Sequence, residues 1–195
     1  MSYFDHCATT PIHPIVIDKM ESTSKTHFGN PSSLHTSGRK AKSLIESSRR
    51  IIANALKAST NEIIFTGSGT EANNSVLWSL IHEENKHVIS SSIEHPAILK
   101  VLDSIAPFGV SYTKLPVNKF GEINPKNLEE SIKKDTGLIS IMMVNNEVGT
   151  INPIKDLIEI AEEKNIPFHS DAVQALGKIP LSVKDIQADY LSFSV

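Results

Sequence analysis

Apolar and polar residues follow two different spacings along the chain, and these spacings predict helices and strands in turn. Between residues 36 and 57 the apolar positions recur at helical spacing with Lys and Arg between them, which predicts a long amphipathic helix. Short apolar runs predict strands at residues 63–66, 87–91, 111–115, 137–144, 166–170 and 189–194. Further helices are expected at residues 14–25, 71–82, 96–106, 124–133 and 154–164. Strands that alternate with helices indicate an α/β fold with a parallel sheet covered by helices on both faces.

The length of 195 residues is sufficient for one large domain with a sizeable core. We expect an N-terminal arm and loop over residues 1–35, followed by a helix and an α/β sheet core over residues 36–195. Formal net charge is -3, which supplies no argument for nucleic acid or a membrane surface as partner. The longest apolar runs, such as residues 138–144, are too short to span a membrane. The N-terminus resembles no secretory signal, so a cytoplasmic location is expected.

Cysteine and histidine usage argues against disulfide and metal chemistry. A single cysteine, Cys7, excludes an internal disulfide and a multi-cysteine zinc site. The eight histidines are scattered without the spacing of metal ligands, so no metal site is expected. We interpret Cys7 as a small buried residue rather than a reactive thiol.

A loop of small residues, Gly67-Ser68-Gly69-Thr70, stands between a predicted strand and a predicted helix. Unpaired N–H groups and the positive end of the helix dipole make such a helix start an anion-binding site. The glycines allow a phosphate to approach the backbone closely, and the hydroxyls add donors. The spacing matches neither the Walker A pattern nor GxGxxG, and by itself the loop is typical of an ordinary connection.

Other polar residues follow the strands, where parallel sheets bind their ligands. These segments are Glu94-His95-Pro96, Asn145-Asn146-Glu147, Asp171-Ala172-Val173-Gln174 and Ser192-Phe193-Ser194. Each has a structural interpretation: the amides turn the chain, the histidine and the aspartate cap helices, and the glutamates brace loops. Together they place a phosphate loop, an imidazole, amides and a carboxylate at one edge. This set suits pyridoxal phosphate (PLP), because a carboxylate keeps the ring nitrogen protonated while an imidazole stacks on the ring.

At this point the sequence resembles the cysteine desulfurases, which have the class V aminotransferase fold. The motifs that carry the resemblance are Asp5-His6-Cys7-Ala8-Thr9-Thr10-Pro11, Phe28-Gly29-Asn30-Pro31-Ser32-Ser33, Thr66-Gly67-Ser68-Gly69-Thr70-Glu71-Ala72-Asn73-Asn74, Glu94-His95, Val144-Asn145-Asn146-Glu147-Val148-Gly149 and Asp171-Ala172-Val173-Gln174. The match runs from end to end and corresponds to about the first half of a family member. It implies a truncated large domain of a PLP-dependent transferase of the aspartate aminotransferase-like fold, fold type I.

The resemblance also implies roles for individual residues. Gly69, Thr70 and Ser194 contact the phosphate, and His95 stacks on the pyridine ring and moves protons. Asn146 and Gln174 lie near the ring oxygen, and Asp171 pairs with the ring nitrogen. Family members convert L-cysteine to alanine and pass the sulfur on as a persulfide for iron–sulfur clusters or tRNA thiolation. They are homodimers and deliver sulfur to an acceptor or scaffold protein.

Two family residues have no counterpart in the chain. The lysine that binds PLP covalently follows the Ser-Phe-Ser motif in the family, whereas here Val195 follows it, and Lys178 and Lys184 stand in another context. The persulfide-forming cysteine belongs to a later segment, and Cys7 is not that residue. The chain alone is therefore expected to be inactive, whether it is a natural truncation, a fragment or one piece of a split enzyme. The alternatives are a selenocysteine lyase or another class V enzyme, and a catalytically dead partner or binding subunit.

Overall fold

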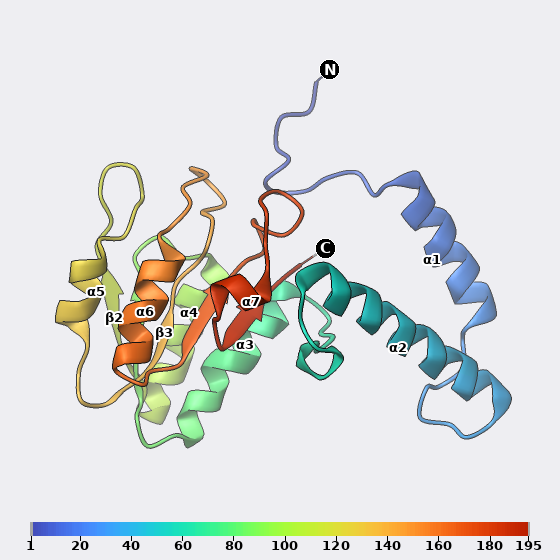
Figure 1. Ribbon diagram of the computed structural model, residues 1–195, viewed down its shortest axis with the longest axis horizontal. Coiled ribbons are helices and arrows are strands. Elements are labelled where there is room, and N and C mark those ends of the chain that lie inside the picture. Colours follow the sequence, from blue (N-terminus) through green and yellow to red (C-terminus); the bar gives the residue numbers. More distant parts are fainter. Residues whose placement is uncertain (1, 195) are drawn as a thin grey trace. The chain divides into compact units, whose positions relative to one another are not determined.

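The computed structural model describes residues 2–194, and the chain divides into two compact units, residues 1–64 and residues 65–195. The first unit contains α1 (Pro14–Thr26), α2 (Thr36–Leu56) and a short 3-10 turn, η1 (Thr60–Glu62) (Figure 1). Both long helices lie where they were expected, and α2 confirms the prediction from hydrophobic spacing. A histidine begins each of them: the Nδ1 atom of His13 accepts the N–H of Ile15, and that of His35 accepts the N–H of Gly38.

The second unit is built on five parallel strands in the order β2-β1-β3-β4-β5. The strands are β1 (His87–Ser91), β2 (Ser111–Leu115), β3 (Thr136–Ser140), β4 (Phe168–Asp171) and β5 (Tyr190–Ser192). The helices are α3 (Gly69–Ser79), α4 (Pro96–Ile105), α5 (Pro125–Ser131), α6 (Ile154–Glu163) and α7 (Val183–Ile186), with 3-10 turns η2 (Leu80–His82) and η3 (Ala106–Phe108). The α/β class and the parallel sheet are therefore confirmed.

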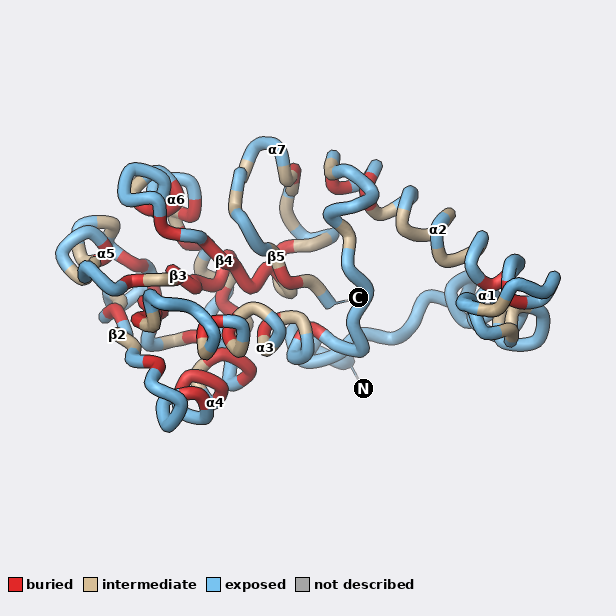
Figure 2. The backbone as a smooth tube through the Cα atoms, turned by 90° about the horizontal axis from the view of Figure 1, so that it is seen from below, coloured by how far each residue is buried: buried red, intermediate tan, exposed pale blue. Residues whose placement is uncertain are grey.

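Helices cover both faces of this sheet, and each face has its own apolar core. On one face, α3 and α4 pack Leu77 and Leu102 against Val88 of β1. On the other face, α5 and α6 pack Leu128 and Leu157 in a cluster that includes residues of β1, β3 and β4. Figure 2 shows the buried strands between these two layers of helices. Because both faces are covered, every residue of β1 and β4 is buried, without the alternation of buried and exposed positions that a one-sided sheet shows.

Two buried histidines join neighbouring strands through serine and threonine hydroxyls. His169 of β4 lies between Ser140 Oγ (2.8 Å) and Ser192 Oγ (2.9 Å), which belong to the strands on either side. His87 of β1 lies in the same way between Thr136 Oγ1 (2.9 Å) and Thr113 Oγ1 (2.8 Å). Burial lowers the pKa of His169 to about 4, so its imidazole is neutral at pH 7.

Two predictions from the sequence are wrong. The apolar residues 63–66 form no strand, because they pair with no other strand in the described part of the chain, and Ile64 is 81% exposed. The carbonyl of Ile63 instead accepts a hydrogen bond from the Arg49 guanidinium. Cys7 is exposed in a turn rather than buried, because no apolar core forms around the arm that carries it. Between residues 2 and 194, no helix combines the length and the apolar character needed to cross a membrane.

Candidate functional site

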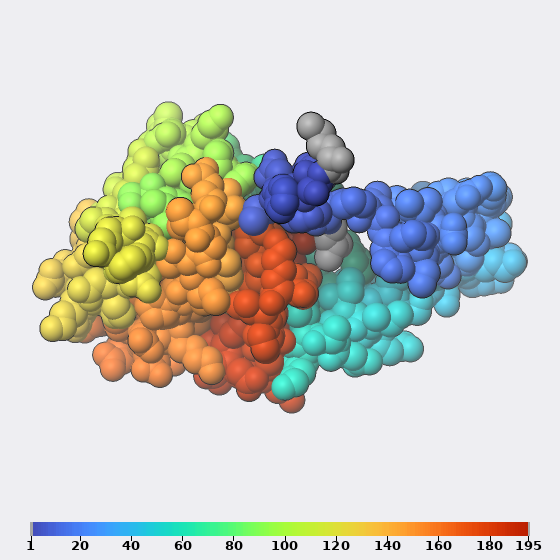
Figure 3. All heavy atoms as spheres, turned by 90° about the horizontal axis from the view of Figure 1, so that it is seen from above, coloured from blue at the N-terminus to red at the C-terminus, as the bar shows by residue number. Residues whose placement is uncertain are grey.

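The carboxyl ends of the five parallel strands lie at one edge of the second unit, and several of the predicted site residues lie at or just after these ends. In Figure 1 the loops after β2, β3 and β4 project on the same side, and Figure 3 shows these loops side by side, viewed onto that edge. The polypeptide continues from β1 into the segment that carries His95, from β3 toward Asn146, and from β5 into Ser194. Right-handed crossovers between parallel strands produce this common edge, which is where such folds bind ligands.

The first turn of α3 forms a cradle for an anion. Ser68 begins the helix, and its Oγ accepts the N–H of Glu71 at 3.1 Å, while Glu71 Oε2 accepts the N–H of Gly67 at 2.6 Å. Within the described part of the chain, no hydrogen bond occupies the N–H groups of Gly69 and Thr70. Two donors at the positive end of a helix dipole remain available for a phosphate.

Gly69 also brings this cradle into contact with the ends of β4 and β5. A Cβ atom at Gly69 would lie 3.1 Å from Val173 Cγ2, 3.3 Å from Ser194 Cβ and 3.5 Å from the Phe193 carbonyl oxygen. Glycine therefore allows the helix start to approach these segments more closely than a larger residue would. Three residues predicted separately to contact a phosphate, Gly69, Thr70 and Ser194, are brought together here.

Asp171 is the last residue of β4 and is only 6% exposed. Its Oδ2 accepts a hydrogen bond from Asn73 Nδ2 at 2.7 Å, and its Oδ1 accepts the N–H of Val173 at 3.1 Å. Asp171 does not cap a helix, since the segment after it forms turns. Asn73 belongs to the motif after the small-residue loop, but its role could not be predicted, because the contact joins residues that are 98 positions apart.

His95 is exposed and begins α4, with its Nδ1 atom accepting the N–H of Ala97 at 3.1 Å. In the neutral ring this bond places the proton on Nε2. The preceding residue, Glu94, is buried and braces the loop as the sequence suggested: its Oε1 accepts the hydroxyl of Ser91 at 2.6 Å and the N–H of Met142 at 2.9 Å. Burial, with a smaller contribution from the charge of Asp171, raises the pKa of Glu94 to about 8, so its carboxyl is neutral at pH 7.

The two remaining predicted residues are half-buried at the same edge. Asn146 follows Asn145, whose Oδ1 accepts the N–H groups of Glu147 and Val148, each at 2.9 Å, and thereby turns the chain as expected. Gln174 lies in the turns after β4, where its Oε1 accepts a hydrogen bond from Lys178. The edge therefore carries donors for an anion at α3, a buried carboxylate at β4 and an accessible imidazole after β1. A ligand with a phosphate at one end and a protonated ring nitrogen at the other fits these groups.

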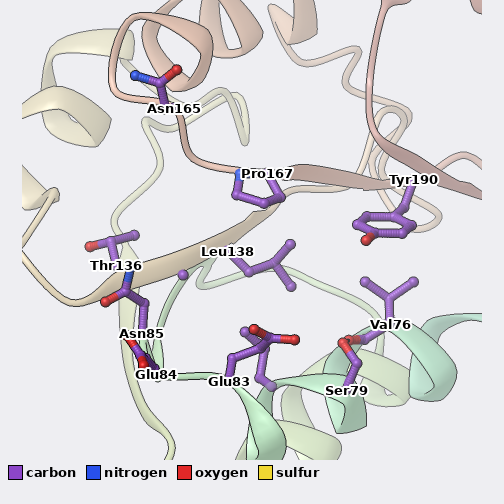
Figure 4. A pocket seen from close by; sticks show the side chains of 12 residues that line it. Val76, Ser79, Glu83, Glu84, Asn85, Thr136, Leu138, Asn165, Pro167 and Tyr190 are labelled. Carbon is purple, nitrogen blue, oxygen red and sulfur yellow. The ribbon is translucent and has the colours of Figure 1, made fainter.

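A hollow of about 590 Å³ lies at the opposite, amino-terminal edge of the sheet. Figure 4 shows it between the end of α3 and the starts of β3 and β5, with Leu138, Pro167 and Tyr190 among its lining residues and Glu83 at its rim. The predicted site residues are absent from its lining, so this hollow is separate from the candidate site.

Comparison with known proteins identifies the family. The model of the class-V aminotransferases matches residues 2–195, so the chain belongs to the class-V aminotransferase family. Within this family it is similar to the cysteine desulfurase IscS of Dictyoglomus turgidum, with 44% identity over 195 residues that cover 98% of this chain and 50% of that protein. Cysteine desulfurase IscS of Methanosarcina thermophila is 45% identical over 98% of this chain and 48% of its own length. The chain thus spans about half the length of these curated relatives.

Solved structures agree with this assignment. A NifS-like protein superimposes with a TM-score of 0.93 and 36% identity, over 98% of this chain and 54% of that structure. The structure of SspA in complex with cysteine has a TM-score of 0.93 and 38% identity, over 100% of this chain and 57% of its own. The five-stranded parallel sheet is accordingly the fold of the NifS-like enzymes over about half of their length.

Proposed function

We propose that the chain forms the PLP-binding half of a cysteine desulfurase. The observation that carries this proposal is the cradle at the start of α3, where two N–H donors are available. The same helix carries Asn73, which donates a hydrogen bond to the buried carboxylate of Asp171. The similarity to cysteine desulfurases over 98% of the chain supports the same conclusion. The substrate is proposed to be L-cysteine, with alanine and a persulfide as products, and the assembled enzyme to be a homodimer that passes sulfur to an acceptor protein.

Each residue of the edge has a separate task in this proposal. Gly69 and Thr70 bind the phosphate through their N–H groups, and Ser194 adds a hydroxyl beside them. The Asp171 carboxylate accepts a hydrogen bond from the protonated ring nitrogen and keeps that proton in place. When bound, PLP supplies the electron sink that makes bonds at the substrate α-carbon reactive, and a protonated ring nitrogen strengthens this effect.

The exposed imidazole of His95 and two amides complete the proposed site. His95 stacks on the flat face of the ring, and its Nε2–H is directed away from Nδ1, which is occupied by the N–H of Ala97. A proton on Nε2 can therefore move to or from a bound substrate without disturbing the start of α4. Asn146 and Gln174 are proposed to hold the ring oxygen through their amide groups.

PLP titration tests the cofactor assignment directly. Equilibrium dialysis of the chain with PLP is expected to show saturable binding that inorganic phosphate displaces. Substitution of Asp171→Asn is expected to weaken PLP binding roughly 10- to 100-fold, because hydrogen bonds to charged groups contribute about 1.5–3 kcal/mol. Phosphate binding is expected to stay unchanged, and exposed Asp156→Asn serves as the matched control. Failure of the unsubstituted chain to bind PLP would refute the proposal.

The substrate is tested by complementation. The chain, co-expressed with the C-terminal half of the Dictyoglomus turgidum relative, is expected to release alanine from L-cysteine. Sedimentation of the same preparation measures whether it is dimeric. Release of alanine from L-selenocysteine alone would contradict the proposed substrate and favour a selenocysteine lyase.

A further inference from the structure

The contact between Asn73 and Asp171 joins α3 to the end of β4 inside the second unit. Asn73 is 1% exposed, and its Nδ2 donates to Asp171 Oδ2 at 2.7 Å. A carboxylate only accepts hydrogen bonds, so the amide nitrogen must face it and the amide oxygen must point away. That oxygen, Asn73 Oδ1, is buried and has no hydrogen-bond partner within the described residues.

Stability alone gives a poor account of this asparagine. A buried amide with one end unpaired costs free energy, whereas an apolar side chain of the same size would not. Asn73 does, however, determine the orientation of the Asp171 carboxylate. One oxygen is held by Asn73 and the other by the N–H of Val173 at 3.1 Å, so the carboxylate plane cannot turn without breaking a hydrogen bond.

The position of Asn73 in α3 gives this contact a further consequence. Asn73 follows Gly69 by four residues, so the two lie on the same face of the helix, one turn apart. The first turn of α3 presents the available N–H groups of Gly69 and Thr70, and the second turn holds Asp171. One rigid helix therefore sets the spacing between the anion cradle and the carboxylate.

We propose that Asn73 is a positioning residue that holds Asp171 at the distance from the α3 cradle that a phosphate-bearing pyridine ring requires. This inference rests on the proposed function, because it assumes that the ligand of the cradle is PLP. Asn73 itself does not touch the ring and acts only through Asp171. Its removal should weaken recognition of the ring nitrogen and leave recognition of the phosphate intact.

The test compares Asn73→Leu with the unsubstituted chain for three ligands: PLP, inorganic phosphate and 1-deaza-PLP, in which a C–H group replaces the ring nitrogen. Leucine has the same number of side-chain heavy atoms and the same branching at Cγ as asparagine, with a somewhat larger volume, and it lacks the donor. PLP affinity is expected to fall about tenfold, because a misplaced Asp171 carboxylate loses its hydrogen bond to the charged ring nitrogen. Affinities for phosphate and for 1-deaza-PLP are expected to stay within about twofold, within the range of independent sites. Asn127→Leu in α5 makes the same exchange at a half-buried position on the other face of the sheet.

A double-substitution cycle separates positioning from packing. If Asn73 acts through Asp171, the variant with both Asn73→Leu and Asp171→Asn binds PLP as Asp171→Asn alone does. Additive losses, or an equal loss of affinity for PLP and 1-deaza-PLP, would overturn the inference and assign Asn73 to packing. If Asn73→Leu does not fold, Asn73→Ala is measured against the same ligands. Absence of PLP binding by the unsubstituted chain would refute the proposed function itself. If the unsubstituted chain binds PLP and Asn73→Leu binds it equally well, only the inference about Asn73 is refuted.

Discussion

Substitution of Glu94→Gln provides a sensitive test of the electrostatics beneath the candidate site. Glu94 is buried, and its pKa is raised from 4.5 to about 8, chiefly by burial. In the native state the carboxyl therefore keeps its proton up to about pH 8, whereas in the unfolded chain it loses the proton above pH 4.5. Since the native state binds more protons in this window, the free energy of unfolding must decrease as the pH rises through it.

The magnitude follows from the two pKa values. Each pH unit within the window contributes about 1.4 kcal/mol, so the native chain should lose about 2 kcal/mol between pH 6.5 and 8 through Glu94. His169 has a native pKa of about 4, so only the unfolded imidazole, with a pKa near 6.5, still releases protons above pH 6.5. This adds about 0.4 kcal/mol of stability by pH 8, and it is the same in wild type and in the Glu94→Gln variant. Glutamine keeps an acceptor oxygen for Ser91 and Met142 and cannot ionise, so the variant should lack this loss.

The assay is urea unfolding at pH 6.5, 7.2 and 8.0 at constant ionic strength. The fluorescence of Trp78, the single tryptophan of the chain, reports on the second unit because Trp78 lies in α3. The exposed residue Glu159 of α6 provides the matched control, Glu159→Gln. The reasoning is refuted if wild type and Glu94→Gln lose stability in parallel from pH 6.5 to 8.

Two further predictions concern the sheet. Burial lowers the pKa of His169 to about 4, so on acidification the unfolded chain takes up the proton first. In urea titrations, the difference in unfolding free energy between wild type and His169→Gln should therefore shrink by about 3 kcal/mol from pH 6.5 to 4. A constant difference would contradict a buried neutral imidazole. At Gly137 a Cβ atom would lie 2.1 Å from the Asn85 carbonyl oxygen. Substitution of Gly137→Ala should therefore lower the unfolding free energy by about 1–3 kcal/mol. An unchanged urea midpoint would show that the backbone moves freely there.

Much of the fold was predictable because the strands and helices of this chain carry clear hydrophobic spacing. The apolar segments around Val88 and Ile139 become central parallel strands, and the amphipathic segment 36–57 becomes α2. Such segments are local in origin, since a helix forms its hydrogen bonds within itself and a continuous apolar run must be buried on both sides. The strand expected at residues 63–66 failed because a strand needs a partner, and the identity of that partner is not encoded in the run itself.

The candidate site was predictable to a different extent at each position. Placing His95 and Asp171 at one edge required only the rule that parallel strands end together, and the structure agrees with it. Gly69 lies beside Val173 and Ser194 although the strand expected before it does not form. The exposure of Cys7 was not predictable, because it depends on whether other segments cover the arm. The raised pKa of Glu94 was equally hidden, since burial causes it and burial depends on segments distant in the sequence, such as that of Met142, whose N–H contacts Glu94 from 48 positions away.

From the amino-acid sequence follow the alternation of helices and strands from β1 onward, the donors at the start of α3 and the residue types at the strand ends. Each of these depends on contacts within a few residues, or on the regular geometry of a parallel sheet. The packing of Ser194 against Gly69 and the hydrogen bond from Asn73 to Asp171 depend instead on tertiary folding. Asn73 and Asp171 are 98 positions apart, and Gly69 and Ser194 are still further apart in the sequence. Both contacts form because packing of α3 on the sheet brings these segments together. The physical link between the phosphate cradle and the buried carboxylate is therefore a property of the fold.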